Sequence, residues 1–160
     1  MHGERAWWKA ALVALGVLAL LGAIGVWQLR RWLRHAIPGE PRNVVGAIVR
    51  GGVGGWEREQ PDGSHRLCPS VHRPVPADGP HSKYQSRPGE WSEAGFDCLR
   101  VDVTSRQYCQ YGYEADAYGF VAWGRCDLDE DGVLSEYRVR GRIVAGEIKL
   151  APIEVTNEGE

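Results

Sequence analysis

The feature that most constrains this chain is a run of 20 consecutive uncharged residues, from Ala10 to Leu29. As an α-helix the run would be about 30 Å long, at roughly 1.5 Å per residue, which matches a bilayer core. A helix also pairs its backbone groups internally, as lipid requires. Lys9 precedes the run and Arg30 follows it. The sequence therefore predicts a membrane anchor, with an aromatic belt formed by Trp7, Trp8, Trp27 and Trp32.

A cleaved secretory signal peptide is the alternative interpretation of this run. The apolar part of such a peptide is roughly 7–15 residues long, and here no A-x-A site follows before Arg30. We therefore favour a retained anchor. This choice assigns residues 1–38 to an N-terminal membrane helix and residues 39–160 to a separate C-terminal domain.

The two parts of the chain differ in charge. Residues 1–38 hold five Lys and Arg against one Glu, whereas residues 39–160 hold 14 Lys and Arg against 20 Asp and Glu. Phosphate binding needs a basic face, so the acidic C-terminal domain argues against nucleic acid as a partner. The seven Trp and six Tyr of the chain argue against disorder.

The four cysteines all lie in the C-terminal domain, and none belongs to a C-x-x-C motif that would suggest zinc. Residues 108–126 look like a β-hairpin, and if Tyr113 faces Ala122 then Cys109 faces Cys126. Opposed residues of a non-hydrogen-bonded pair lie close enough for a disulfide. The remaining two cysteines would then pair as well, so the predicted disulfide residues are Cys68, Cys98, Cys109 and Cys126.

The cysteines also bear on the compartment of the domain. Two disulfides imply an oxidising, extracytoplasmic space, whereas four buried free thiols would fit the cytosol. The numbers of positive charges on the two sides of the apolar run are nearly equal. By the positive-inside rule they slightly favour a cytoplasmic C-terminal domain. We give the cysteines more weight and predict a single-pass protein whose C-terminal domain is periplasmic or extracellular.

A helix, a loop and a set of strands are predicted in the C-terminal domain. Over residues 41–58 the apolar side chains fall on one helical stripe, although five glycines would each weaken a helix by about 1 kcal/mol. Residues 60–97, rich in Pro, Gly, Ser and Asp, suggest a long loop. We predict an α+β domain with four or five antiparallel strands within residues 98–151 and a tail over residues 152–160. The strand patterns cover residues 98–104, 108–113, 119–126, 136–143 and 147–151.

Three arginines share one face of the predicted strand 136–143, namely Arg138, Arg140 and Arg142. We interpret this row as the solvated face of a sheet, because the alternate residues of the strand are mostly apolar.

An acidic loop, DLDEDG, joins two of the predicted strands. The carboxylates of Asp127, Asp129 and Asp131 match positions 1, 3 and 5 of a D-x-D-x-D-G calcium loop, with Glu136 as a substitute ligand. Arg138 occupies the position where an EF-hand has its bidentate Glu, so an EF-hand is not expected. The sequence permits Ca²⁺ as a cofactor, and the alternative is an Asp/Gly hairpin turn without metal.

The order of these segments resembles the type IV pilin and pseudopilin family, and most closely its pilin-like proteins of myxobacterial type. The resemblance covers nearly all of the chain beyond residue 40. It is carried by PRNVVGAIVRGGVGGWERE (41–59), HRLCPSVHRPVPADGPHSKYQS (65–86), GFDCLRV (95–101), QYCQYGYE (107–114) and GFVAWGRCDLDEDGVLSEYRVRG (119–141). The resemblance implies a spine helix packed on a four-stranded sheet in an extracytoplasmic position. The usual prepilin cleavage motif, a Gly before a Phe-led apolar stretch with a Glu five places in, is missing.

Taken together, these patterns predict a pilin-like protein of the bacterial inner membrane. Its expected role is a minor subunit or assembly factor of a type IV pilus or type II secretion filament. Its partners would be the lipid bilayer and other pilin-like subunits or the pilus or secretion machinery, without nucleic acid. The alternative is a membrane-tethered, Ca²⁺-dependent binding module of the envelope. No set of catalytic residues can be placed together by spacing, and we do not expect an enzyme.

Overall fold

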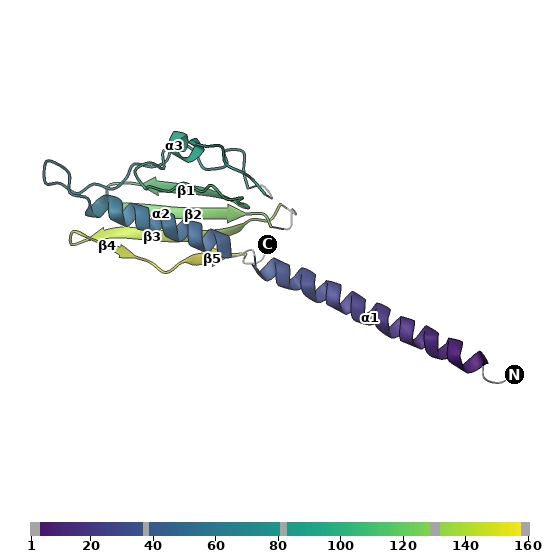
Figure 1. The fold of residues 1–160 in the computed structure, drawn as a ribbon. Helices are drawn as coiled ribbons and strands as arrows, with labels where there is room; N and C mark the ends of the chain where they lie inside the picture. The colour runs from purple at the N-terminus through teal and green to yellow at the C-terminus, as the bar shows by residue number, and fades with distance from the viewer. Residues whose placement is uncertain (1–3, 37–38, 81–82, 129–131, 158–160) are drawn as a thin grey trace. The chain divides into compact units, whose positions relative to one another are not determined.

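The computed structural model describes residues 4–36, 39–80, 83–128 and 132–157. The chain divides into two compact units, Met1–Ile37 and Pro38–Glu160. This division falls one residue from the predicted boundary. The first unit holds the helix α1, and the second holds the remaining helices and all strands (Figure 1).

The helix α1 (Glu4–Ala36) contains the predicted apolar run. Its stretch from Ala11 to Gln28 has a mean hydropathy of 2.1, and these side chains are exposed throughout. The helix is long and apolar enough to cross a membrane, but a signal sequence would pass the same test. The apolar helix is therefore confirmed, while its insertion in a bilayer stays a prediction.

The second unit contains an antiparallel sheet whose first four strands follow one another in space and in sequence. These are β1 (Cys109–Ala115), β2 (Gly119–Cys126), β3 (Ser135–Val144) and β4 (Glu147–Leu150). A short strand, β5 (Glu154–Thr156), also pairs with β3. Because β4 pairs with the end of β3 and β5 with its beginning, both lie along the edge of β3 that β2 leaves open. The α+β class and the antiparallel sheet are as predicted.

The helix α2 (Gly39–Glu57) agrees with the helix predicted over residues 41–58, and it lies across the β1–β2–β3 face of the sheet (Figure 1). Its buried residues recur at spacings of three and four, which places them on one stripe. Two glycines on this helix make close approach possible. A Cβ on Gly51 would collide with the carbonyl oxygen of Leu99, and a Cβ on Gly52 would lie 3.1 Å from the ring of Tyr113.

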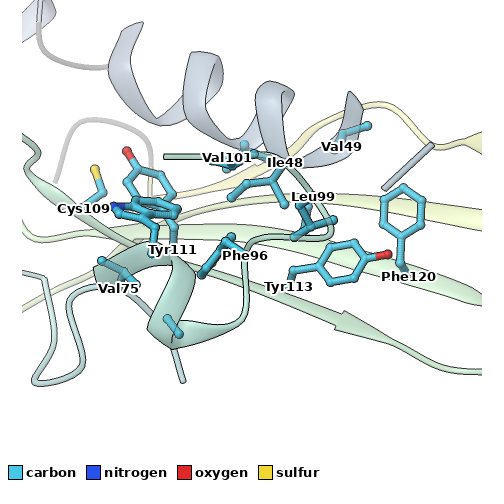
Figure 2. Packing of buried hydrophobic residues seen from close by; sticks show 14 of the residues in the cluster. Ile48, Val49, Val75, Phe96, Leu99, Val101, Cys109, Tyr111, Tyr113 and Phe120 are labelled. Carbon is cyan, nitrogen blue, oxygen red and sulfur yellow. The ribbon is translucent and has the colours of Figure 1, made fainter. Parts of the chain in front are cut away.

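The core fills the space between α2 and the sheet (Figure 2). The strands contribute aromatic rings, α2 contributes aliphatic side chains, and the segment before β1 contributes further apolar side chains. In Figure 2 these groups are Tyr111, Tyr113 and Phe120 from the strands, Ile48 and Val49 from α2, and Val75, Phe96, Leu99 and Val101 from the loop.

The strand predicted over residues 98–104 is wrong. Residues 97–100 form a turn in which Arg100 has a positive φ of 54°, and residues 101–104 belong to no helix or strand. The alternation that suggested a strand is still real, because Leu99 and Val101 are 2% and 9% exposed while Arg100 and Asp102 point to solvent. The alternating pattern indicates which side chains contact the core, but it does not indicate whether the segment pairs with another strand.

The predicted loop over residues 60–97 has more order than its composition suggests. It contains the short helix α3 (Glu90–Ala94). An extended stretch follows the outer edge of β1, where Val75 exchanges two backbone hydrogen bonds with Tyr111, of 3.0 and 2.8 Å. This stretch covers an edge that would otherwise be open to pairing with another chain.

The buried side chain of Trp91 holds the loop over residues 60–97 against the core. Trp91 of α3 is fully buried, and its ring meets Phe96 edge-on at 4.5 Å between centroids. Its Nε1 donates to the Ser86 hydroxyl at 3.0 Å, and that hydroxyl bonds Oε1 of Gln107 at 3.2 Å. The polar tip of the indole is therefore satisfied inside the core.

The predicted tail over residues 152–160 is also only partly correct. Residues 154–156 form β5, so the sheet ends at Thr156 rather than at residue 151. Ile153 and Val155 pack against the core, which explains why this short segment stays on the sheet.

Candidate functional site

The acidic loop predicted to hold Ca²⁺ begins directly after β2. Asp127 follows Cys126, whose bond to Cys109 fixes this point of the chain. Its Oδ2 accepts a hydrogen bond of 3.2 Å from the amide of Gly132, whose φ of 87° suits a sharp turn. Its Oδ1 is buried and has no hydrogen-bond partner among the described residues. A buried carboxylate oxygen without a partner is costly, so this atom favours a nearby cation or donor.

Of the other expected ligands, the structure describes only Glu136. Asp129 and Asp131 lie outside the described residues. Glu136, the substitute ligand, instead accepts a hydrogen bond of 2.6 Å from Arg138 Nη2 and lies 3.5 Å from Arg125 Nη2, so its charge is already balanced. Within the described ranges, no group of three or more His, Cys, Asp or Glu could hold a metal ion. Calcium binding therefore stays a prediction.

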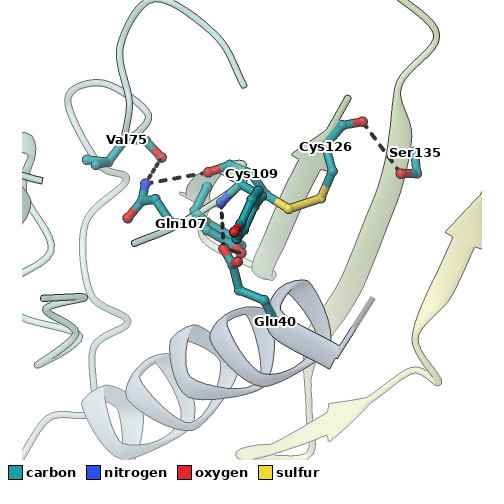
Figure 3. The surroundings of a disulfide bond; sticks show 8 residues. Glu40, Val75, Gln107, Cys109, Cys126 and Ser135 are labelled. Atoms are coloured by element: carbon teal, nitrogen blue, oxygen red, sulfur yellow. Dashed lines mark hydrogen bonds between the residues drawn. A yellow bond between two sulfur atoms is a disulfide. The ribbon is translucent and has the colours of Figure 1, made fainter. Parts of the chain in front are cut away.

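The disulfide at the start of the sheet joins β1 to β2. Cys109 and Cys126 are paired in the β1–β2 register, as the hairpin argument predicts, and their sulfur atoms are bonded (Figure 3). Both cysteines are fully buried. Glu40 reaches this end of β1 from the first turn of α2, and its Oε1 accepts bonds from the Tyr108 amide at 3.0 Å and the Tyr111 hydroxyl at 2.9 Å.

The carboxyl group of Glu40 is perturbed by its surroundings. Desolvation by burial raises its pKa, and the hydrogen bonds from Tyr108 and Tyr111 oppose the shift without cancelling it. The same burial and the adjacent carboxylate raise the pKa of Tyr111, which keeps that hydroxyl protonated as a donor. Sequence reasoning missed Glu40 because its partners lie 68 and 71 positions away.

The second disulfide joins Cys68 to Cys98 and closes the long loop, with a separation of 30 residues. Cys68 is buried, while Cys98 is partly exposed. Arg58, just beyond α2, donates to the Cys98 carbonyl at 2.6 Å, and its Nη2 lies 3.6 Å from both sulfur atoms. A fixed positive charge beside a disulfide stabilises the thiolate that reduction would release. No local sequence pattern indicated this role for Arg58.

The predicted arginine row lies on the outer face of the sheet but is not simply solvated. Arg138 pairs with Glu136, and Arg140 Nη1 contacts both carboxylate oxygens of Glu154 at 2.7 and 2.9 Å. Arg142 is exposed and makes no ion pair with another described residue. Carboxylates on β3 itself and on β5 therefore balance most of this face, which reduces its capacity to attract an acidic partner.

Comparison with known proteins adds no assignment at this point. No family model, no curated protein and no solved structure matches the chain. The resemblance to pilins therefore depends on the sequence segments and on the order of the elements.

Proposed function

We propose that this chain is a pilin-like, single-pass protein of the bacterial inner membrane that acts as a minor subunit or assembly factor of a type IV pilus or type II secretion filament. In this proposal α1 lies in the bilayer and the disulfide-bonded domain projects into the periplasm or the extracellular space. Its role is to contact other subunits, and no catalysis is involved.

One observation carries the proposal. An apolar helix of membrane-spanning length is followed by an amphipathic helix that lies across an antiparallel sheet, as expected for a pilin-like spine and head. The two disulfides, Cys68–Cys98 and Cys109–Cys126, further support an oxidising compartment. The exposed apolar side chains of α1, such as Leu20 and Ile24, offer a surface that lipid or another apolar helix could cover.

Photo-crosslinking from α1 in intact cells tests this proposal. A Leu20→p-benzoylphenylalanine variant should crosslink to pilin-like subunits or to the pilus or secretion machinery. A Val144→p-benzoylphenylalanine variant, with the probe at an exposed position in the sheet, serves as the control for random encounter. Crosslinks from Leu20 only to lipid, or recovery of the chain in the soluble fraction, would overturn the proposal.

A Ca²⁺-dependent envelope binding module is the second candidate. It is favoured by the buried Oδ1 of Asp127, which has no hydrogen-bond partner among the residues that the structure describes. Calorimetric titration of the full chain in detergent with CaCl₂ should then give heat at millimolar concentrations, as in weak extracellular sites. Asp127→Asn should abolish that heat, while Asp62→Asn, which alters an exposed Asp/Ser turn, should not. An absence of heat together with an unchanged melting temperature would contradict Ca²⁺ binding.

A further inference from the structure

A groove runs along the exposed side of α2 and is separate from the acidic loop. Its wall is the chain from Cys98 to Ser105, and its floor is formed by small side chains of α2, among them Ala47 and Gly54. The groove encloses about 750 Å³. It follows α2 from Asn43 to Gly54, a length of about 17 Å at roughly 1.5 Å per residue. These dimensions suit an extended peptide better than a compact small molecule.

The groove is basic although the domain around it is acidic. Three arginines line it, Arg50, Arg58 and Arg100, against one carboxylate, Asp102. Arg50 and Arg100 are exposed, and neither forms a hydrogen bond or ion pair with any other residue in the described ranges. By sequence the domain has 14 basic and 20 acidic residues, so this local excess of positive charge runs against the average. Such a site attracts an anionic chain by complementary charge.

The wall of the groove also offers an open backbone edge. Val101, Asp102 and Val103 belong to no helix or strand, and their backbone groups have no hydrogen-bond partner in the part of the chain that the structure describes. Their side chains alternate as in a strand, with Val101 turned to the core and Asp102 to solvent. Strand addition requires a receptor segment whose backbone groups are unpaired, because main-chain bonds supply affinity without a fixed sequence.

We propose that this groove binds an extended acidic peptide segment of a partner protein, which adds as a strand along residues 101–103 and places its carboxylates against Arg50 and Arg100. Backbone bonds fix the direction of the peptide, and the two exposed guanidinium groups select for acidic side chains. This assignment is independent of the filament role, since a peptide-binding groove would serve either candidate function.

Fluorescence anisotropy with the full chain in detergent tests the assignment. The probe is a labelled short peptide of alternating Glu and Thr, with the corresponding Lys/Thr peptide as the charge control. The acidic peptide should bind and the basic one should not. The double variant Arg50→Gln/Arg100→Gln should weaken binding by roughly tenfold, because two charge-assisted contacts are lost. Arg142→Gln, an equal charge change at an exposed arginine of the sheet, should leave binding unchanged.

A second peptide separates strand addition from simple charge attraction. N-methylation at alternate positions of the acidic peptide removes its amide donors and keeps its charge, and it should abolish binding. Equal binding of the methylated peptide would overturn the proposal. So would an absence of binding, or capture of an anionic polysaccharide in place of the peptide. Melting temperatures of all variants exclude loss of folding as the cause.

Discussion

At the scale of single residues, Glu40 couples the first turn of α2 to the start of β1. Its carboxylate accepts two hydrogen bonds, from the Tyr108 amide and the Tyr111 hydroxyl, in a site where burial disfavours the charge. The group therefore connects two elements and at the same time makes their connection sensitive to pH.

We expect this sensitivity in the free energy of unfolding. The pKa of Glu40 is higher in the folded chain than its ordinary value, so the folded state binds more protons than the unfolded state between those two values. The contribution of Glu40 is full below the ordinary pKa and is lost as the pH rises through the folded pKa. Urea unfolding over this pH range should show the fall in the native chain, and Glu40→Gln should remove it.

The alanine variant provides the contrast. Glu40→Ala leaves the amide of Tyr108 and the hydroxyl of Tyr111 without an acceptor, which should cost about 1–3 kcal/mol at neutral pH. Glu40→Gln retains an acceptor oxygen and should cost less. An equal loss in both variants would show that the hydrogen bonds to Glu40 do not matter.

Two glycines of α2 give a matched test of how closely the chain packs. A Cβ at Gly51 would collide with the carbonyl of Leu99, whereas a Cβ at Gly54 has nothing within 4 Å. Gly51→Ala should lower the free energy of unfolding by about 1–3 kcal/mol through overpacking. Gly54→Ala should raise it by about 0.5–1 kcal/mol through helix propensity. Equal effects in urea unfolding would contradict the close contact at Gly51.

At the scale of elements, the two disulfides differ in accessibility. Cys109 and Cys126 are fully buried between β1 and β2, while Cys98 is partly exposed and has Arg58 beside it. Each bond closes a loop, of 30 residues for Cys68–Cys98 and 17 for Cys109–Cys126, worth about 3–4 kcal/mol in either case. Their entropic contributions are therefore similar, and accessibility decides which one reacts first.

We predict that graded reduction of the folded chain opens Cys68–Cys98 first. Alkylation and mass mapping should find Cys98 labelled while Cys109 and Cys126 remain bonded until the chain unfolds. Arg58→Met should slow this first step, because it removes the charge that stabilises the released thiolate. Simultaneous loss of both bonds, or first reaction at Cys109, would contradict the prediction.

The elements also show what the sequence can predict. The β1–β2 hairpin and its disulfide follow from alternation and from the constant sum of paired residue numbers, which are local rules. The stripe of α2 likewise follows from spacing alone. The strand predicted over residues 98–104 was wrong because alternation of apolar and polar residues indicates burial, not strand pairing. The neighbour of this segment is the helix α2 rather than a strand.

The remaining elements depend on contacts that are distant in sequence. The order of α3 comes from the burial of Trp91 among residues of β1 and the loop, and β5 is held by pairing with β3. Of the acidic loop, the structure places Asp127, one of whose oxygens has no partner in the described ranges, while Asp129 and Asp131 lie outside those ranges. No local sequence pattern indicated the hydrogen bonds that Glu40 and Arg58 make.

At the scale of the whole molecule, the chain combines two units that suit different surroundings. One is a helix whose side chains from Ala11 to Gln28 are mostly apolar and are exposed, which in water would be unfavourable. The other is a cross-linked α+β domain with its own core. A chain of this kind is stable when lipid or protein covers the helix and an oxidising space preserves the disulfides.

The most direct test of this account is peptide mass mapping, without reductant, of the chain extracted from carbonate-washed membranes. We predict a peptide that still contains the apolar run of α1, together with the bonded pairs Cys68–Cys98 and Cys109–Cys126. Four free thiols, or a soluble chain that begins beyond residue 28, would contradict it, the first by placing the domain in a reducing space and the second by identifying α1 as a removed signal sequence.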